Sequence, residues 1–161
     1  GYVGILILSR HYADAAALAD SIFAKAPADL LNLLYRGFAK ALVHECDGLA
    51  GFEQAGALMP NDPVVKAFLA NAYIWCDHTD RARELLEALR QRRLKHYVPA
   101  ISFAYIFAGL REPDSAFTWL EHAVDERSAH VSYLTAHPAW DPIRADPRFS
   151  ALLKRTGLPT R

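Results

Sequence analysis

Histidine and cysteine side chains lie close together at two points of the sequence, in His44-Glu45-Cys46 and Cys76-Asp77-His78. Two His and two Cys can complete a tetrahedral zinc site, and two thiols can instead pair as a disulfide. The usual Cys-x-x-Cys spacing is absent, and the two cysteines occupy different positions within the repeat described below. We therefore interpret the four side chains as isolated turn and core residues, with zinc binding and a thiol pair as open alternatives.

The only basic run is Arg90-Gln91-Arg92-Arg93-Leu94-Lys95-His96. Such a run can contact nucleic acid, but cations also complement the dipole at the C-terminus of a helix. No aromatic residues are interleaved with it, and the 18 basic and 18 acidic side chains of the chain cancel. We therefore predict a solvated helix end and no nucleic-acid partner.

No group of residues is typical of an active site. His122 and Asp125 lie at helical spacing, but no nucleophile accompanies them and no Gly-x-Ser-x-Gly elbow occurs. The carboxylates of Glu84, Glu87 and Glu121 fall on outer helix faces, where no pocket would raise a pKa. We therefore predict a protein that is not an enzyme and has no cofactor and no metal.

The overall composition favours a globular domain that folds without disulfides or metals. The chain has 161 residues, of which 52 % are hydrophobic, yet no stretch reaches the roughly 20 apolar residues that span a bilayer. We expect no membrane contact within it. Two cysteines are too few for a disulfide framework, which favours a reducing compartment and a cytoplasmic location. The apolar start, residues 1–8, has no basic leader and resembles the second half of a helix rather than a signal peptide.

Similar residues recur at a fixed spacing. A shift of 34 aligns Leu69 with Phe103, Ala70 with Ala104, Tyr73 with Phe107, Ala82 with Ala116, Leu86 with Leu120 and Leu89 with Ala123. The same register extends back to Gly48, Phe52 and Ala55, while Pro27 and Pro60 are 33 apart. A period in this range is typical of a helical-hairpin repeat. In the clearest repeat, Asp62-Pro63 is a helix start and Thr79-Asp80 begins the second helix.

This pattern resembles the tetratricopeptide repeat over about residues 1–127. In that family large, small and aromatic residues mark the first helix, and Ala, Leu and Pro mark the second. The resemblance implies an all-α fold, an α-solenoid of antiparallel helix pairs in a superhelix with a C-terminal helical cap. We predict one domain, 1–161, consisting of a truncated repeat (1–29), three repeats (30–60, 61–94 and 95–128) and a cap (129–161). The repeat at 30–60 lacks one residue between its helices.

The cap departs from the period but contains the helix starts Asp141-Pro142 and Asp146-Pro147. Its apolar residues are expected to seal the last repeat: Tyr133, Trp140, Ile143, Phe149, Leu152 and Leu153. Four cations, Arg144, Arg148, Lys154 and Arg155, would remain outside. This ending resembles the C-terminal repeat region of bacterial multidomain signalling proteins, in which such repeats follow a nucleotide-cyclase domain or a winged-helix DNA-binding domain.

In tetratricopeptide stacks the first helix of each pair lines a concave groove. The predicted protein-binding groove residues are Val64, Ala67, Asn71, Trp75, Val98, Ile101 and Tyr105. An apolar groove with Tyr and Trp anchors suits a bound peptide or helix. We therefore predict a protein–protein interaction module or scaffold whose partner is a protein or peptide. The alternative is a regulatory or dimerisation arm of a larger signalling protein, in which the chain would form a homodimer.

Overall fold

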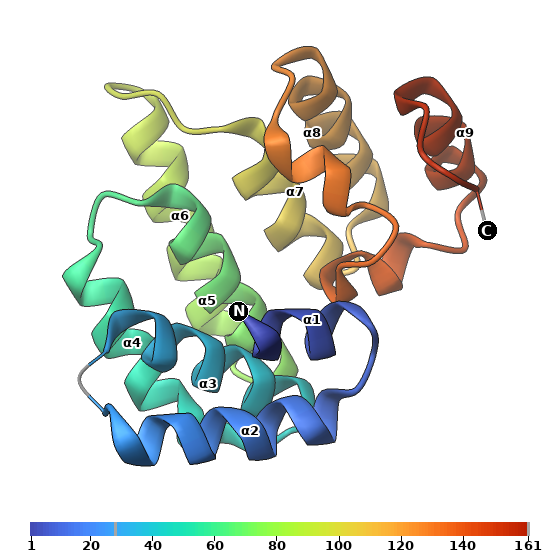
Figure 1. Ribbon diagram of the computed structural model, residues 1–161. Helices are drawn as coiled ribbons and strands as arrows, with labels where there is room; N and C mark the ends of the chain where they lie inside the picture. The colour runs from blue at the N-terminus through green and yellow to red at the C-terminus, as the bar shows by residue number, and fades with distance from the viewer. Residues whose placement is uncertain (28, 161) are drawn as a thin grey trace.

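The computed structural model describes residues 1–27 and 29–160, and that part of the chain is helical with no strand (Figure 1). The α-helices are α1 (Tyr2–Leu8), α2 (Tyr12–Lys25), α3 (Leu30–Leu42), α4 (Leu49–Leu58), α5 (Pro63–Trp75), α6 (Thr79–Arg93), α7 (Ala100–Gly109), α8 (Pro113–Asp125) and α9 (Pro147–Thr156). Three 3₁₀ helices are η1 (Cys46–Gly48), η2 (Ala129–Tyr133) and η3 (Pro138–Ile143). Successive helices pair and stack, which confirms the predicted all-α helical-repeat solenoid.

Aspartate caps start several of these helices, as the sequence predicts. Asp62 Oδ1 accepts hydrogen bonds from the backbone N–H groups of Val64 (2.9 Å) and Val65 (3.1 Å), and Pro63 takes the first helical position. Asp29 caps α3 and Asp146 caps α9 in the same manner. Each cap satisfies a backbone donor that has no partner inside the helix.

The turn inside each helix pair is the most regular feature of the backbone. Its left-handed residue is Arg10, His44, Asp77 and Arg111 in turn, with φ between 59° and 71° and spacings of 34, 33 and 34 residues. In each case the following N–H bonds to the carbonyl five residues earlier, which is the Schellman arrangement. The backbone therefore repeats with the period that the sequence shows.

The repeat that lacks one residue joins its helices differently. Gly48 follows the left-handed His44 by four residues, whereas Ala82 follows Asp77 by five. The shorter connection is wound as η1 before α4 begins at Leu49. This tight turn moves Cys46 away from the position that the repeat would otherwise give it.

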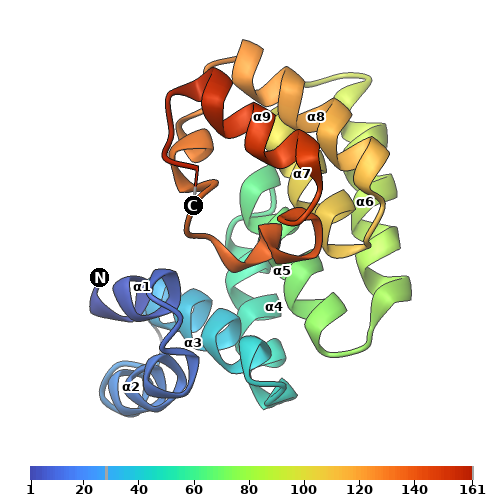
Figure 2. The same ribbon diagram turned by 90° about the vertical axis from the view of Figure 1, so that its right-hand side faces the viewer.

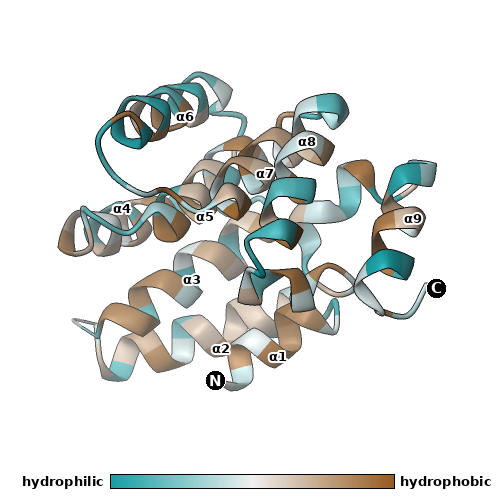
Figure 3. Cartoon of the chain, turned by 90° about the horizontal axis from the view of Figure 1, so that it is seen from above, coloured by the Kyte–Doolittle hydropathy of each residue, from teal (hydrophilic) through white to brown (hydrophobic). Residues whose placement is uncertain are grey.

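Small residues let the helices approach one another. Ala70, Ala82, Ala104 and Ala116 are completely buried. The polar residues lie on the outer helices, so that α6 is largely hydrophilic while α7 is largely hydrophobic (Figure 3). Within residues 1–27 and 29–160, no helix combines the length and the apolar character needed to cross a membrane.

Gly37 marks the closest approach between α3 and α4. A Cβ at this position would lie 2.5 Å from Cβ of the buried Phe52 and 2.9 Å from its Cγ. Real Cβ atoms do not approach this closely, so a larger residue must move one of the two helices.

We expect Gly37→Ala to lower the free energy of unfolding by about 1–3 kcal/mol through overpacking. Gly56→Ala on α4 is the matched control, because its added Cβ would meet only Leu69 Cδ2 at an ordinary 3.6 Å. That control should be neutral or stabilising, since Ala is the better helix former. Urea denaturation of both variants tests this, and equal midpoints would contradict the close approach.

The C-terminal part differs from a simple terminal cap. As expected, the buried residues include Trp140, Ile143, Phe149, Leu152 and Leu153. Tyr133, however, is 45 % exposed, and Arg144 is partly buried rather than outside. The predicted helix start at Asp141-Pro142 is wrong, because Pro142 lies inside η3 and this helix begins at Pro138. His137 takes the capping role, with its Nδ1 accepting from the N–H of Ala139.

Candidate binding site

The structure places the seven predicted groove residues on α5 and α7 and in the turn before α7. Five of them have no exposed surface: Ala67, Asn71, Val98, Ile101 and Tyr105. Val64 and Trp75 are partly exposed. The concave side of the solenoid is therefore not an open groove in this chain.

The chain's own segment between α8 and α9 covers this side. Residues 134–143, which we call the C-terminal segment, run across α7 toward α1 (Figure 2). The indole of Trp140 stacks on the Tyr105 ring, with centroids 4.4 Å apart and planes at 21°. The imidazole of His137 stacks on Phe68 in the same way, at 5.4 Å and 16°. An aromatic anchor thus occupies the surface that was predicted to receive a partner.

Arginine side chains hold the C-terminal segment in place. Arg10, in the first turn, makes a bidentate ion pair with Asp141, with one contact of 2.7 Å from Nη2 to Oδ1. Arg144 donates to the backbone carbonyls of Leu134, Thr135 and His137 at 2.9–3.3 Å. The guanidinium of Arg144 therefore satisfies carbonyls that no regular helix pairs, which explains its partial burial.

Asn71 does not face a partner but joins two helices. Its Nδ2 donates to the carbonyl of Ala67 (3.0 Å) and to that of Tyr105 (3.1 Å) on α7. Gly109 allows this contact, since a Cβ there would lie 2.6 Å from Asn71 Oδ1. A polar side chain that is buried and bonded across two helices is a packing element of the stack.

A hollow remains beside the C-terminal segment. This cavity of about 340 Å³ is bounded by α1, α3, α5 and the C-terminal segment. Its walls are almost entirely apolar and include Ile7, Leu8, Leu34, Phe38 and Phe68. The polar side chains among its lining residues are Tyr35, Tyr105, His130, Tyr133 and His137. The cavity is the part of the concave side that the segment leaves unfilled.

His137 is held in its neutral form. Burial lowers its pKa to about 3, and the neighbouring His130 adds to this effect. The pKa of His130 is also lowered by burial. The positive charges of Arg10 and Arg144 lower the pKa of His137 further. Asp141 raises it, but by less than burial lowers it.

The stability of the protein should consequently fall in mild acid. Unfolded His137 binds its proton near pH 6.5, whereas the folded residue does so only near pH 3, so the unfolded state takes up more protons below pH 6.5. We expect a loss of roughly 2–3 kcal/mol between pH 7.5 and pH 4.5 from this residue. Urea midpoints at both pH values measure it. The variant His137→Asn keeps a capping oxygen but has no proton to gain, so its free energy of unfolding should fall much less between these pH values. An equal fall would show that His137 does not cause the pH dependence.

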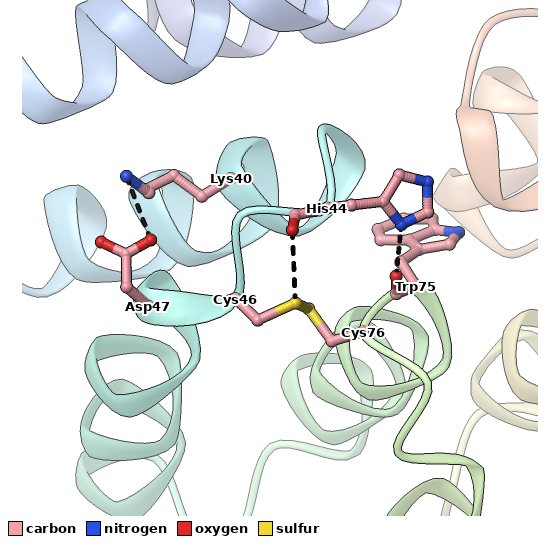
Figure 4. The surroundings of a disulfide bond; sticks show 6 residues. All are labelled: Lys40, His44, Cys46, Asp47, Trp75 and Cys76. Atoms are coloured by element: carbon pink, nitrogen blue, oxygen red, sulfur yellow. Dashed lines mark hydrogen bonds and ion pairs between the residues drawn. A yellow bond between two sulfur atoms is a disulfide. The ribbon is translucent and has the colours of Figure 1, made fainter.

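The Cys and His residues singled out above meet at the edge of the stack. Cys46 and Cys76 form a disulfide, with Cα atoms 5.8 Å apart (Figure 4). The interpretation of isolated cysteines is therefore wrong, and the open alternative of a thiol pair holds. Cys46 reaches Cys76 because the shortened connection winds it into η1, beside the end of α5.

The same residues are not arranged to bind zinc. Both sulfurs are used in the disulfide, and His44 Nδ1 donates to the carbonyl of Trp75 at 2.7 Å (Figure 4). His78 packs edge-on against the Tyr73 ring. Among residues 1–27 and 29–160, no group of three or more His, Cys, Asp or Glu side chains could hold a metal ion.

The basic run contacts the chain itself. Arg93 lies over the Trp119 ring at 4.7 Å and donates to the carbonyl of Val98, while Arg92 donates to Asn61. His122 lies near Trp119 rather than binding Asp125. Asp125 and Glu121 instead form ion pairs with Arg155 of α9. These side chains tie neighbouring helices together.

The family comparison agrees with this architecture. The model of the tetratricopeptide repeat matches residues 38–98, from α3 to the turn before α7. This segment is therefore similar to the tetratricopeptide repeat. No curated protein and no solved structure matches the chain. Tetratricopeptide repeats generally mediate protein–protein interaction, and the matched segment carries Val64, Trp75 and the disulfide.

Sequence reasoning missed the part that the C-terminal segment plays in the site. His137 and Trp140 were not predicted as site residues, although a segment with a His, a Trp and two prolines is unusual for a terminal cap. The available signal was the presence of these large rings beside prolines, which prevent a regular helix. The arginine at position 10 gave no signal, since its partner lies 131 residues away.

Proposed function

We propose that this chain is a protein–protein interaction module whose concave side, formed by α3, α5 and α7, recognises an extended segment with an aromatic anchor. The observation that supports it most directly is that the chain's own C-terminal segment already binds there through Trp140 and Tyr105. A partner segment would use the same rings and would contact Val64 and Trp75, which keep exposed surface. Aromatic anchors in a pocket provide most of the energy of such contacts.

A peptide with the sequence of residues 129–145 tests the proposal. In the wild-type chain the covalently attached segment acts at an effective concentration on the order of millimolar, so the free peptide should not bind. The variant Trp140→Ala loses the indole that stacks on Tyr105, so its attached segment competes less strongly and a fluorescently labelled peptide should bind with a measurable rise in anisotropy. A peptide in which Trp140 is replaced by Ala is the control. If the variant binds both peptides equally or neither, the proposed recognition is incorrect.

A second candidate is a regulatory or dimerisation arm of a larger signalling protein, such as a nucleotide cyclase or a transcriptional regulator. The exposed apolar side chains Tyr2 and Ile5 of α1 and Leu31 of α3 favour it. Light scattering coupled to size exclusion, over a concentration series, distinguishes the two. A dimer that Leu31→Glu dissociates supports the arm, whereas a monomer at every concentration removes this candidate.

The disulfide bears on the location. The sequence predicts the cytoplasm, where thiols are kept reduced. The Cys46–Cys76 bond favours an oxidising compartment, and we propose that the module works in one. Trapping free thiols with an alkylating reagent in intact cells tests this, because a protein recovered with both cysteines alkylated would point to the cytoplasm.

A further inference from the structure

We propose that the cavity between α1, α3, α5 and the C-terminal segment binds one small uncharged molecule, largely aromatic, whose carbonyl oxygen accepts a hydrogen bond from Nε2 of His137.

The dimensions of the cavity favour a small molecule over a peptide. Its volume of about 340 Å³ is at the lower end of the range for small-molecule sites. A helix with its side chains is about 10 Å wide and would require the C-terminal segment to leave. A molecule of two fused rings fits without displacing any element.

The walls of the cavity favour flat apolar groups. Phe38 and Phe68 meet edge to face with centroids 5.6 Å apart, and Phe68 meets Tyr105 in the same way at 5.0 Å. These three rings line the hollow. Aromatic ligands gain from such offset and edge contacts beyond the area they bury.

His137 supplies one directed donor. Its Nδ1 accepts from the N–H of Ala139 at 3.2 Å, which leaves the ring proton on Nε2. Within the described chain no protein group accepts that proton, although the side chain is only 8 % exposed and lines the cavity. The Nε2–H is not fully buried, so a ligand oxygen in the cavity would replace water as its acceptor.

The electrostatics exclude a charged ligand. Of the residues that the structure describes, no Lys, Arg, Asp or Glu lines the cavity. Both histidines are neutral near pH 7 because burial lowers the pKa of each. A carboxylate or an ammonium group would lose its hydration without gaining a counter-charge.

The rim allows entry. Leu31 is 59 % exposed and Tyr133 is 45 % exposed, and both contribute to the lining. Leu31 belongs to α3 and Tyr133 to η2. Side-chain rotation at the rim would therefore admit a ligand while the C-terminal segment stays in place.

The test uses two probes with the intact wild-type chain at pH 7.5. 2-Acetylnaphthalene carries the carbonyl, and 2-ethylnaphthalene has nearly the same shape without it. Titrations followed by NMR should give a Kd of roughly 0.1–1 mM for the ketone, as expected of a ligand of this size. The hydrocarbon should bind about five- to tenfold more weakly, which corresponds to one hydrogen bond. Equal affinities, or no binding of the ketone up to its solubility, would overturn the proposal.

Two variants locate the binding. His137→Phe keeps a ring but removes the donor, so the two probes should bind alike. Leu34→Trp fills the cavity from α3 and should abolish binding of both, whereas Leu94→Trp, on an exposed site away from the cavity, should change neither. Circular dichroism checks the folding of each variant. Unaltered ketone binding by a folded Leu34→Trp variant would also overturn the proposal. If this variant does not fold, the comparison of the two probes with the wild-type chain tests the proposal by itself. Because the C-terminal segment remains bound here, this result is independent of the peptide experiment above.

Discussion

Replacing Trp140 by alanine should lower the free energy of unfolding by about 3–5 kcal/mol, which is the usual cost of removing a buried aromatic side chain. The indole has no exposed surface and joins the C-terminal segment to α7 by stacking on Tyr105. No helix of the repeats can move in to fill the space, because α7 is already packed against α5 and α8. Urea denaturation monitored by circular dichroism measures the change.

Trp140→Phe is the informative control. It keeps a ring against Tyr105, and it removes the indole Nε1–H, which is buried without a hydrogen-bond partner in the described chain. We expect a loss of less than about 1.5 kcal/mol, since the gain from removing an unsatisfied donor offsets part of the lost volume. A Phe variant as unstable as the Ala variant would show that the size of the ring, and not its stacking, fixes the segment.

Reducing the Cys46–Cys76 disulfide should have the second large effect. The bond closes a loop with a sequence separation of 30. Cross-linking over this length removes chain entropy from the unfolded state, so reduction should lower the free energy of unfolding by roughly 2–4 kcal/mol. The bond joins the turns of two adjacent helix pairs. Urea midpoints with and without a phosphine reductant provide the measurement.

A variant with both Cys46→Ala and Cys76→Ala should unfold at the midpoint of the reduced protein and should not respond to the reductant. Its insensitivity separates loss of the bond from any other effect of the reagent. Two free thiols titrated in the denatured, non-reduced protein would contradict the disulfide itself.

The sequence was most informative where local rules and the repeat agree. Asp62-Pro63 predicts a helix start because the carboxylate can accept from the first free N–H groups, and the structure has this cap. Ala70 and Ala104 are small at equivalent positions because helices cross there, and both are buried. Spacing of this kind depends only on short stretches of chain, so it can be recognised without a structure.

The candidate site depends on contacts that spacing does not encode. From the sequence, Tyr105 could be an exposed anchor in the groove or a core residue. Which of the two it is depends on whether another segment covers it. That segment lies outside the period and contains prolines that prevent a regular helix, so neither its path nor the new role of His137 follows from propensity. Likewise, the sequence shows that one residue is missing between the helices of the repeat at 30–60, but not that the resulting turn brings Cys46 to Cys76.

The ion pair between Arg10 and Asp141 changes how the repeats depend on one another. In an open solenoid each unit contacts only its neighbours, so unfolding can begin at either end and advance unit by unit. Here the turn between α1 and α2 contacts the C-terminal segment, which packs on the last complete helix pair, α7 and α8. The two ends of the stack are therefore connected. Fraying at one end then requires release of the other. The chain should consequently unfold as a single cooperative unit, and hydrogen exchange should show α1 protected to nearly the same degree as α7.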